Sequence, residues 1–267
     1  MRADKYFAEQ FGSRTKAAEA IEKGLVLING KPVKPKDEIK ETDEITLLST
    51  QDVFVSNGGY KLQRAVDELG FSPQGKVFVD IGASTGGFTQ CLLKNGAKKV
   101  YAVDVGESLL HESLRFDERI TQMENTNARY LTRADFSDAI DGVVTDVSFI
   151  SLRFIFPVIK ELLVDNGEAV VLIKPQFECE KRQDLGKSGI VSPALHSKIV
   201  EKVLSYAKES GLYPFAITNA PIRKGKNIEY VMLVKPSGIG SKNAAEILSE
   251  VKRIVKENKT ERKTKNG

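Results

Sequence analysis

From residue 57 onward, short apolar runs alternate with stretches whose apolar positions recur at helical spacing. The apolar runs predict strands at Val77–Val79, Val100–Val103, Ile120–Met123, Gly142–Thr145 and Ala169–Ile173. The helical stretches lie at Gly86–Lys94, Leu152–Leu163, Ser192–Ser210 and Lys242–Lys256, and a terminal antiparallel hairpin is predicted at Tyr213–Thr218 and Ile228–Val234. Strands that are apolar on both faces need helices on both sides. The pattern therefore predicts an α/β fold with a doubly wound, mainly parallel sheet.

The first 48 residues have a different pattern, that of a small α+β domain. Ser13 can cap a helix that ends at Gly24, because its hydroxyl can accept a hydrogen bond from a backbone amide of the first turn. Strands at Leu25–Ile28 and Glu44–Leu48, with a turn at Asn29-Gly30, complete this unit. We therefore expect a small domain at residues 1–48, a linker at 49–56, a large domain at 57–256 and a basic, disordered tail at 257–267.

Composition limits the class of protein. Hydrophobic residues make up 41% and charged residues 28%, as in an ordinary soluble globular protein. Apolar stretches such as Ala169–Ile173 are far shorter than the roughly 20 residues of a membrane-spanning helix, and the charged start is unlike a secretory signal. Cys91 and Cys179 are too isolated for a disulfide framework or a zinc site. We expect a cytoplasmic protein.

Charge is mild in sum, with a net value of +4, but it is unevenly distributed. Between Arg2 and Lys36 there are eight bases and four acids, and between Lys252 and Gly267 there are seven bases and two acids. Basic surfaces of this kind favour contact with nucleic acid, although a solvated chain end gives the same pattern.

A glycine-rich turn follows the first strand of the large domain. The run from Val77 to Phe88 is an apolar strand that ends in Asp80 and leads through glycines into a helix. Glycines let the backbone approach a nucleoside closely, and Asp104, after the second strand, can accept both ribose hydroxyls. A turn without a ligand would explain the glycines alone, but the two acids argue against it. Asn127, after the third strand, is placed to contact an adenine.

Two cofactors compete for such a turn. A dinucleotide usually needs a second glycine where this chain has Ser84, so that its pyrophosphate can reach the helix N-terminus. Asp80 also puts a negative charge beside the pocket, which is unfavourable for a diphosphate. The cationic sulfonium of S-adenosylmethionine suits that charge better.

Four charged residues stand near the ends of separate elements: Lys61, Asp146, Lys174 and Glu229. Ligands of an open parallel sheet bind beyond the carboxyl ends of its strands, so Asp146 and Lys174 should converge there. Each residue alone could merely end a strand, but their shared location favours a catalytic role. A lysine beside an acid can deprotonate a hydroxyl or stabilise a developing alkoxide, and the sequence leaves both open. The long charged stretch from Lys174 to Val191 is a candidate lid.

The motifs resemble those of one known family. Asp80–Thr89, Asp146–Leu152, Lys174–Glu178 and Asn227–Tyr230 are similar to the TlyA family of ribosomal-RNA methyltransferases. That family joins an FtsJ-like catalytic domain to an N-terminal domain like the RNA-binding fold of the fourth small-subunit ribosomal protein. Arg2, Asp4, Ser13, Arg14, Ala17, Gly24, Val26, Asn29 and Gly30 carry the N-terminal match. The resemblance implies a Rossmann-like class I methyltransferase sheet with helices on both faces, preceded by a small α+β RNA-binding domain.

The resemblance also implies an activity, the transfer of a methyl group from S-adenosylmethionine to a cytidine ribose 2′-hydroxyl in ribosomal RNA or a ribosomal subunit. It implies a catalytic tetrad of Lys61, Asp146, Lys174 and Glu229. Cofactor-binding residues are expected at Asp80, Gly82, Ala83, Ser84, Gly86, Gly87, Phe88, Asp104, Asn127 and Asp146. RNA-binding bases are expected at Arg2, Lys5, Arg14, Lys16, Lys23 and Lys31. Neither a metal nor a membrane is expected as a partner.

One departure and two alternative functions accompany the resemblance. Asn57 stands where many relatives have an arginine before the glycine pair, so a guanidinium that could contact phosphate is missing there. The family has also been labelled haemolysin, but a membrane-active protein would need an amphipathic or spanning segment that the sequence lacks. An inactive RNA-binding protein would be expected to lack tetrad residues, and all four are present.

Overall fold

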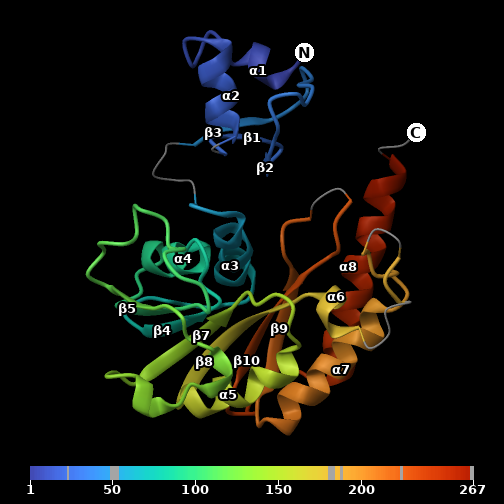
Figure 1. Ribbon diagram of the computed structural model, residues 1–267. Helices are drawn as coiled ribbons and strands as arrows, with labels where there is room; N and C mark the ends of the chain where they lie inside the picture. The colour runs from blue at the N-terminus through green and yellow to red at the C-terminus, as the bar shows by residue number, and fades with distance from the viewer. Residues whose placement is uncertain (23, 49–53, 180–183, 187–188, 223–224, 265–267) are drawn as a thin grey trace. The chain divides into compact units, whose positions relative to one another are not determined.

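The computed structural model describes residues 1–22, 24–48, 54–179, 184–186, 189–222 and 225–264 (Figure 1). The chain forms two compact units, Met1–Phe54 and Val55–Gly267. This division falls within the expected linker at 49–56, of which residues 49–53 lie outside the described residues.

The N-terminal unit is a small α+β fold. Its elements are α1 (Ala3–Tyr6), α2 (Arg14–Glu22), β1 (Val26–Ile28), β2 (Lys31–Pro32) and β3 (Ile45–Leu47), and the antiparallel sheet has the order β2-β1-β3. Ser13 Oγ accepts a hydrogen bond from the Lys16 amide at 3.1 Å, at the predicted start of α2. Asn29 and Gly30 have left-handed φ angles of 51° and 70° and turn the chain between β1 and β2. The small core consists of Ala3, Phe7, Ala17, Ile21, Val26, Ile28 and Ile39.

The large unit contains a seven-stranded sheet in the order β6-β5-β4-β7-β8-β10-β9. The strands are β4 (Val77–Ile81), β5 (Lys99–Val103), β6 (Ile120–Met123), β7 (Ile140–Thr145), β8 (Leu163–Ile173), β9 (Tyr213–Asn219) and β10 (Tyr230–Lys235). Strands β4 to β8 are parallel, and β10 runs antiparallel to both β8 and β9. The predicted α/β class, including the terminal hairpin, is confirmed.

Helices cover both faces of this sheet (Figure 1). On one face lie α3 (Asn57–Glu68) and α4 (Gly87–Lys94), and on the other lie α5 (Phe156–Leu162), α7 (His196–Glu209) and α8 (Ala244–Thr264). The short helices are α6 (Pro175–Glu178), η1 (Ala128–Tyr130), η2 (Arg133–Asp135) and η3 (Leu152–Phe154). Among the described residues, no helix is both long enough and apolar enough to cross a membrane.

Several elements differ from the sequence prediction. Strand β8 begins at Leu163 rather than Ala169, with a register shift against β7 that accommodates its polar start. The helix expected at Leu152–Leu163 is split into η3 and α5, because Pro157 fits only the first turn of a helix. The candidate lid Lys174–Val191 begins with the helical turn α6, and its residues 180–183 and 187–188 lie outside the described residues.

The disordered tail predicted at 257–267 is corrected as far as Thr264, and residues 265–267 lie outside the described residues. Helix α8 continues to Thr264 instead of ending at Lys256. Its buried face, with Val251, Ile254 and Val255, extends to Asn258, whose amide donates to the Ile254 carbonyl at 3.2 Å. The lysines, glutamate and arginine that follow have high helix propensity, so a charged composition alone did not indicate disorder.

Candidate active site at the carboxyl edge of the sheet

A cavity of about 340 Å³ opens at the carboxyl ends of β4, β7 and β8, a size suited to a small-molecule ligand. The first turn of α3 and the glycine-rich turn before α4 form two of its walls, and the ends of β7 and β8 complete it. The lining residues are Ser56, Asn57, Gly58, Lys61, Gly82, Ala83, Ser84, Thr85, Gly87, Phe88, Asp146, Ser148 and Lys174.

The glycine-rich turn is built for close approach. Gly86 has a φ of 90°, and a Cβ atom there would lie 2.5 Å from the Leu114 Cδ1 atom. A Cβ atom on Gly87 would lie 2.2 Å from the Ser56 Oγ and 2.9 Å from the Gly59 amide nitrogen. Gly87 therefore lets the start of α4 pack directly against the first turn of α3, and Gly86 lets the turn pack against Leu110 and Leu114. Ser84 adopts a left-handed φ of 49° and exposes its side chain at the cavity.

Asp80 lies behind this turn rather than in the cavity wall. Its side chain is fully buried, and one carboxylate oxygen accepts a hydrogen bond from the Thr89 hydroxyl at 2.6 Å. Burial raises the pKa of Asp80 to about 7, against the lowering effect of hydrogen bonds from Thr89. Among the described residues that line the cavity, the acid is Asp146. The negative charge that the sequence pattern assigned to Asp80 thus comes from a different strand.

Asp104 links the end of β5 to the glycine-rich turn. Its two carboxylate oxygens accept hydrogen bonds from the Ser84 amide at 2.8 Å and the Gly106 amide at 2.9 Å. Asn127 is half-buried, and its side-chain oxygen accepts from the Arg129 amide at 3.2 Å at the start of η1. Neither side chain is among the described residues that line the cavity, and each has a structural partner of its own.

The four charged residues expected to act together do converge. Asp146 lies between the two lysines, with its Oδ1 2.7 Å from Lys174 Nζ and its Oδ2 3.1 Å from Lys61 Nζ. Lys61 Nζ also lies 2.8 Å from Glu229 Oε2. Lys61 lies in the second turn of α3 and not at the end of an element. The prediction that it joins the other three residues is therefore correct, but its predicted position in the secondary structure is not.

The surroundings of both lysines are partly desolvated. Burial lowers the pKa of Lys61, but the charges of Asp146 and Glu229 outweigh it, and the net pKa is raised. Lys174 is 8% exposed. Besides Asp146, its ammonium donates to the Ser148 hydroxyl at 2.8 Å. Ser148 was not singled out from the sequence, although it lies inside the Asp146–Leu152 motif.

An exposed aromatic ring stands next to this cluster. Phe149 is 91% exposed and has a φ of 63°, an uncommon conformation for a residue with a bulky side chain. Its ring lies 4.9 Å from that of Phe177, which follows Lys174 in α6. An apolar ring in such a position offers a stacking surface beside the tetrad.

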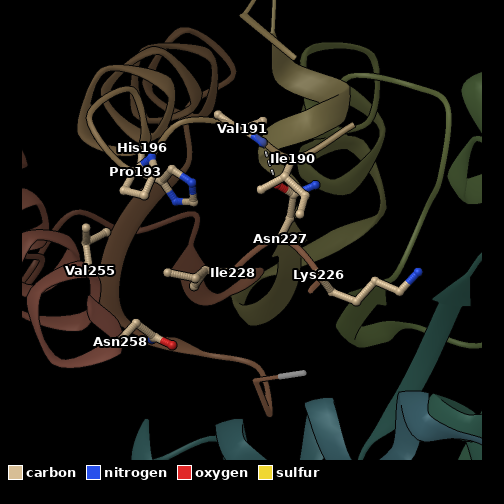
Figure 2. A pocket seen from close by; sticks show the side chains of 9 residues that line it. All are labelled: Ile190, Val191, Pro193, His196, Lys226, Asn227, Ile228, Val255 and Asn258. Atoms are coloured by element: carbon tan, nitrogen blue, oxygen red, sulfur yellow. Dashed lines mark hydrogen bonds between the residues drawn. The ribbon is translucent and has the colours of Figure 1, made fainter. Parts of the chain in front are cut away.

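A second, water-sized cavity of about 30 Å³ lies near the start of α7, between His196, Ile228 and Val255 (Figure 2). The Asn227 side chain accepts from the Val191 amide at 2.8 Å and donates to the Gly189 carbonyl at 3.0 Å. Tyr230 and His196 are joined by a hydrogen bond of 2.7 Å. The residues on either side of Glu229 are therefore tied to the segment that leads into α7.

In the N-terminal unit, the buried Asp4 pairs with two of the basic residues that are expected to bind RNA. Its carboxylate accepts from Arg2 Nη2 at 2.7 Å and Arg14 Nε at 3.1 Å, and the Arg2 hydrogen bond is the main cause that lowers the pKa of Asp4. The side chains of these arginines remain 42% and 57% exposed. Lys5, Lys16 and Lys31 are exposed, and Lys23 lies outside the described residues.

Comparisons with known proteins agree with this architecture. Residues 54–235 match the FtsJ-like methyltransferase family, and residues 1–45 match the S4 domain. Hemolysin A of Brachyspira hyodysenteriae is 44% identical over 86% of this chain and 98% of its own. The 16S/23S rRNA (cytidine-2′-O)-methyltransferase TlyA of Mycobacterium tuberculosis is 36% identical over 92% of both chains.

A solved structure from Streptococcus thermophilus that carries the hemolysin label is 36% identical, with a TM-score of 0.70 over 97% of this chain and 98% of its own. The matches to sequences and structures thus span both units. The chain belongs to the TlyA family of FtsJ-like methyltransferases, with an S4 domain at its N-terminus.

Proposed function

We propose that this protein transfers a methyl group from S-adenosylmethionine to the 2′-hydroxyl of a cytidine in ribosomal RNA. The observation that carries the proposal is the convergence of Lys61, Asp146, Lys174 and Glu229 beside a cavity walled by a glycine-rich turn. The activity named for the Mycobacterium tuberculosis relative supports this choice of substrate. A ribosomal substrate also supports a location in the cytoplasm.

The cavity suits S-adenosylmethionine better than a dinucleotide. The turn from Gly82 to Phe88 would hold the nucleoside and methionine parts, and Asp104 would accept from the ribose hydroxyls. Ser84 fills the place where a dinucleotide needs a bare glycine. Asp146 also places a carboxylate in the cavity wall, which is less unfavourable for a sulfonium than for a diphosphate. When bound, S-adenosylmethionine supplies an electrophilic methyl group.

The tetrad can prepare a ribose hydroxyl for attack. A hydroxyl is a weak nucleophile, so its proton must be removed or its developing negative charge stabilised. Lys174 Nζ lies 2.7 Å from Asp146 Oδ1 and donates to the Ser148 hydroxyl at 2.8 Å, and these two contacts fix the position of its amine. There Lys174 can either take the hydroxyl proton as a neutral amine or, as an ammonium, stabilise the alkoxide while the proton passes to solvent. Lys61, which is itself paired with Glu229, holds the other carboxylate oxygen of Asp146 in place, and thereby orients Lys174.

The cofactor assignment is tested by Asp104→Ala. Loss of charge-assisted hydrogen bonds to the ribose should weaken S-adenosylmethionine binding by about 10- to 100-fold, measured by calorimetry. Asp117→Ala removes an acid that pairs with Arg119 just before the start of β6, and should leave the affinity unchanged. Equal affinities for the wild type and Asp104→Ala, or tighter binding of NAD than of S-adenosylmethionine, would overturn the assignment.

Phe149→Ala tests whether the exposed ring receives a base of the RNA. Stacking contributes about 1–3 kcal/mol per base, so kcat/KM for RNA should fall roughly 5- to 100-fold without a change in cofactor affinity. Phe149→Trp should keep most of the activity. Phe154→Ala is a matched control, because that ring is 51% exposed on the adjacent η3. The stacking role is wrong if the two alanine variants behave alike.

The function itself is tested with purified small and large ribosomal subunits. The protein, S-adenosylmethionine and each subunit are incubated, and 2′-O-methylcytidine is measured by mass spectrometry of RNA digests. We expect new 2′-O-methylcytidine at a defined position in at least one subunit RNA. Methylation of a base instead of a ribose, or no methylation of either RNA, would refute the proposed reaction.

A further inference from the structure

Glu178, the last residue of α6, is a buried carboxylate that the proposed chemistry does not use. It is 4% exposed. Its Oε2 accepts from the Ser151 hydroxyl at 2.6 Å, and its Oε1 accepts from the Leu152 amide at 2.8 Å. Burial of a carboxylate is unfavourable unless hydrogen bonds compensate for it, and here both oxygens have a donor.

These bonds join two motifs of the sequence at their far ends. The first motif leaves β7 at Asp146 and ends at Ser151 and Leu152, and the second leaves β8 at Lys174 and ends at Glu178. Both motifs therefore begin at a tetrad residue. We call the first one, residues 146–152, the β7 loop.

The β7 loop and the segment after β8 are connected at three levels. At their start, Asp146 forms its ion pair with Lys174, at 2.7 Å. Midway, Ser148 accepts from Lys174 at 2.8 Å and Phe149 lies against Phe177. At their end stands Glu178. Loss of the Glu178 carboxylate would therefore leave the β7 loop connected to the segment after β8 only at its start and midway, with its far end unanchored.

The local backbone needs such an anchor. Phe149 has a left-handed backbone conformation and a solvent-exposed side chain. A bulky residue rarely adopts this conformation unless its surroundings impose it. Leu152 is 1% exposed, so without Glu178 its amide would be cut off from water and unpaired. The loop would be expected to rearrange to satisfy that amide.

We propose that Glu178 is a positioning residue for methyl transfer, which acts by fixing the end of the β7 loop so that Ser148 stays on Lys174 and Phe149 stays beside the tetrad. This inference rests on the proposed function, because turnover on ribosomal RNA is its main readout. The Lys174–Glu178 motif would then have two roles: it supplies Lys174, and through Glu178 it fixes the β7 loop.

The test compares Glu178→Ala, Glu178→Gln and Ser151→Ala with Glu168→Ala. Glu168 is a matched control: it is 5% exposed, pairs with Lys76 at 2.6 Å and lies in the interior of β8. Glu178→Ala should lower kcat at saturating RNA and cofactor at least about tenfold, while the Kd for S-adenosylmethionine changes less than about threefold. Glu178→Gln should restore most of the turnover, because an amide can bond to both partners.

Ser151→Ala should cause a smaller loss, and the double variant Glu178→Ala/Ser151→Ala should be no worse than Glu178→Ala alone. A kcat of Glu178→Ala within twofold of the wild type would overturn the proposal. So would an equal loss in Glu168→Ala for the same drop in Tm, since that would mean general destabilisation. If Glu178→Ala does not fold, Ser151→Ala and Glu178→Gln decide: a wild-type kcat in Ser151→Ala, or no turnover in a folded Glu178→Gln, counts against it.

Hydrogen exchange separates this inference from the proposed function. In the protein without RNA, amides of the β7 loop should exchange faster in Glu178→Ala than in the wild type, and should be unchanged in Glu168→Ala. Unchanged exchange in Glu178→Ala refutes the anchor even if the enzyme methylates RNA as proposed. Faster exchange in a protein whose wild type does not methylate RNA refutes only the proposed reaction.

Discussion

Lys174→Ala is expected to lower the turnover of ribosomal RNA methylation by about a thousandfold, in the range of a lost acid–base or alkoxide-stabilising group. Lys174 is the least exposed member of the tetrad and lies 2.7 Å from Asp146. The affinity for S-adenosylmethionine should change little, because the glycine-rich turn and Asp104 are untouched. Single-turnover rates on ribosomal subunits, together with calorimetry of cofactor binding, provide the measurement.

Lys174→Arg distinguishes the two ways in which the amine can act. Arginine keeps the positive charge but does not lose a proton near neutral pH, so it can stabilise an alkoxide but cannot serve as a base. Substantial residual activity would favour stabilisation of the alkoxide, and a loss as large as that of Lys174→Ala would favour proton removal. Wild-type turnover in Lys174→Ala would remove Lys174 from the reaction altogether.

Removal of the N-terminal unit, residues 1–54, is expected to reduce methylation of ribosomal subunits by roughly a hundredfold or more at physiological salt, because contacts from Lys and Arg to phosphate supply most of the affinity for RNA. Cofactor binding should persist, since every described residue that lines the cavity belongs to the large unit. Methylation rates at subsaturating RNA over a series of salt concentrations measure the effect.

A charge reversal tests the same surface in the intact chain. Lys5, Lys16 and Lys31 are exposed, and their joint replacement by Glu should approach the effect of the deletion. Lys98, Lys208 and Lys242 are exposed on the large unit, and their joint replacement changes the net charge equally. A similar loss in both triple variants would show that overall charge, rather than docking through the N-terminal unit, governs activity.

The sequence predicted those parts of the site that follow from topology. Asp146 and Lys174 come directly after neighbouring parallel strands, so their meeting at one sheet edge is dictated by the fold. The position of Lys61 was harder to predict from the sequence, because a Gly58-Gly59 pair is typical of a loop. In the structure a helix begins there instead, and Ser56 caps it by accepting from the Gly58 amide at 3.3 Å.

Other features depend on the direction of a side chain, which a residue pattern does not contain. Asp80 lies within β4, where alternate side chains point to opposite faces, and its carboxylate points to Thr89 of α4 instead of the cavity. Glu178 and Ser151 are far apart in sequence, and their partnership exists only once β7 and β8 are adjacent. Both residues look in the sequence like ordinary polar positions.

The mutual pairing of the tetrad makes the site electroneutral: two ammonium groups and two carboxylates lie within 3.1 Å of a partner. A polyanion such as RNA is therefore neither drawn to this spot nor driven from it by long-range forces. Electrostatic attraction of RNA is thus expected from the N-terminal unit, and methyl transfer from the tetrad. Ionic strength should therefore change the rate of RNA binding far more than the rate of methyl transfer to a bound ribose. Because these ion pairs are partly buried, dissolved salt should screen the charges around the reacting atoms only weakly.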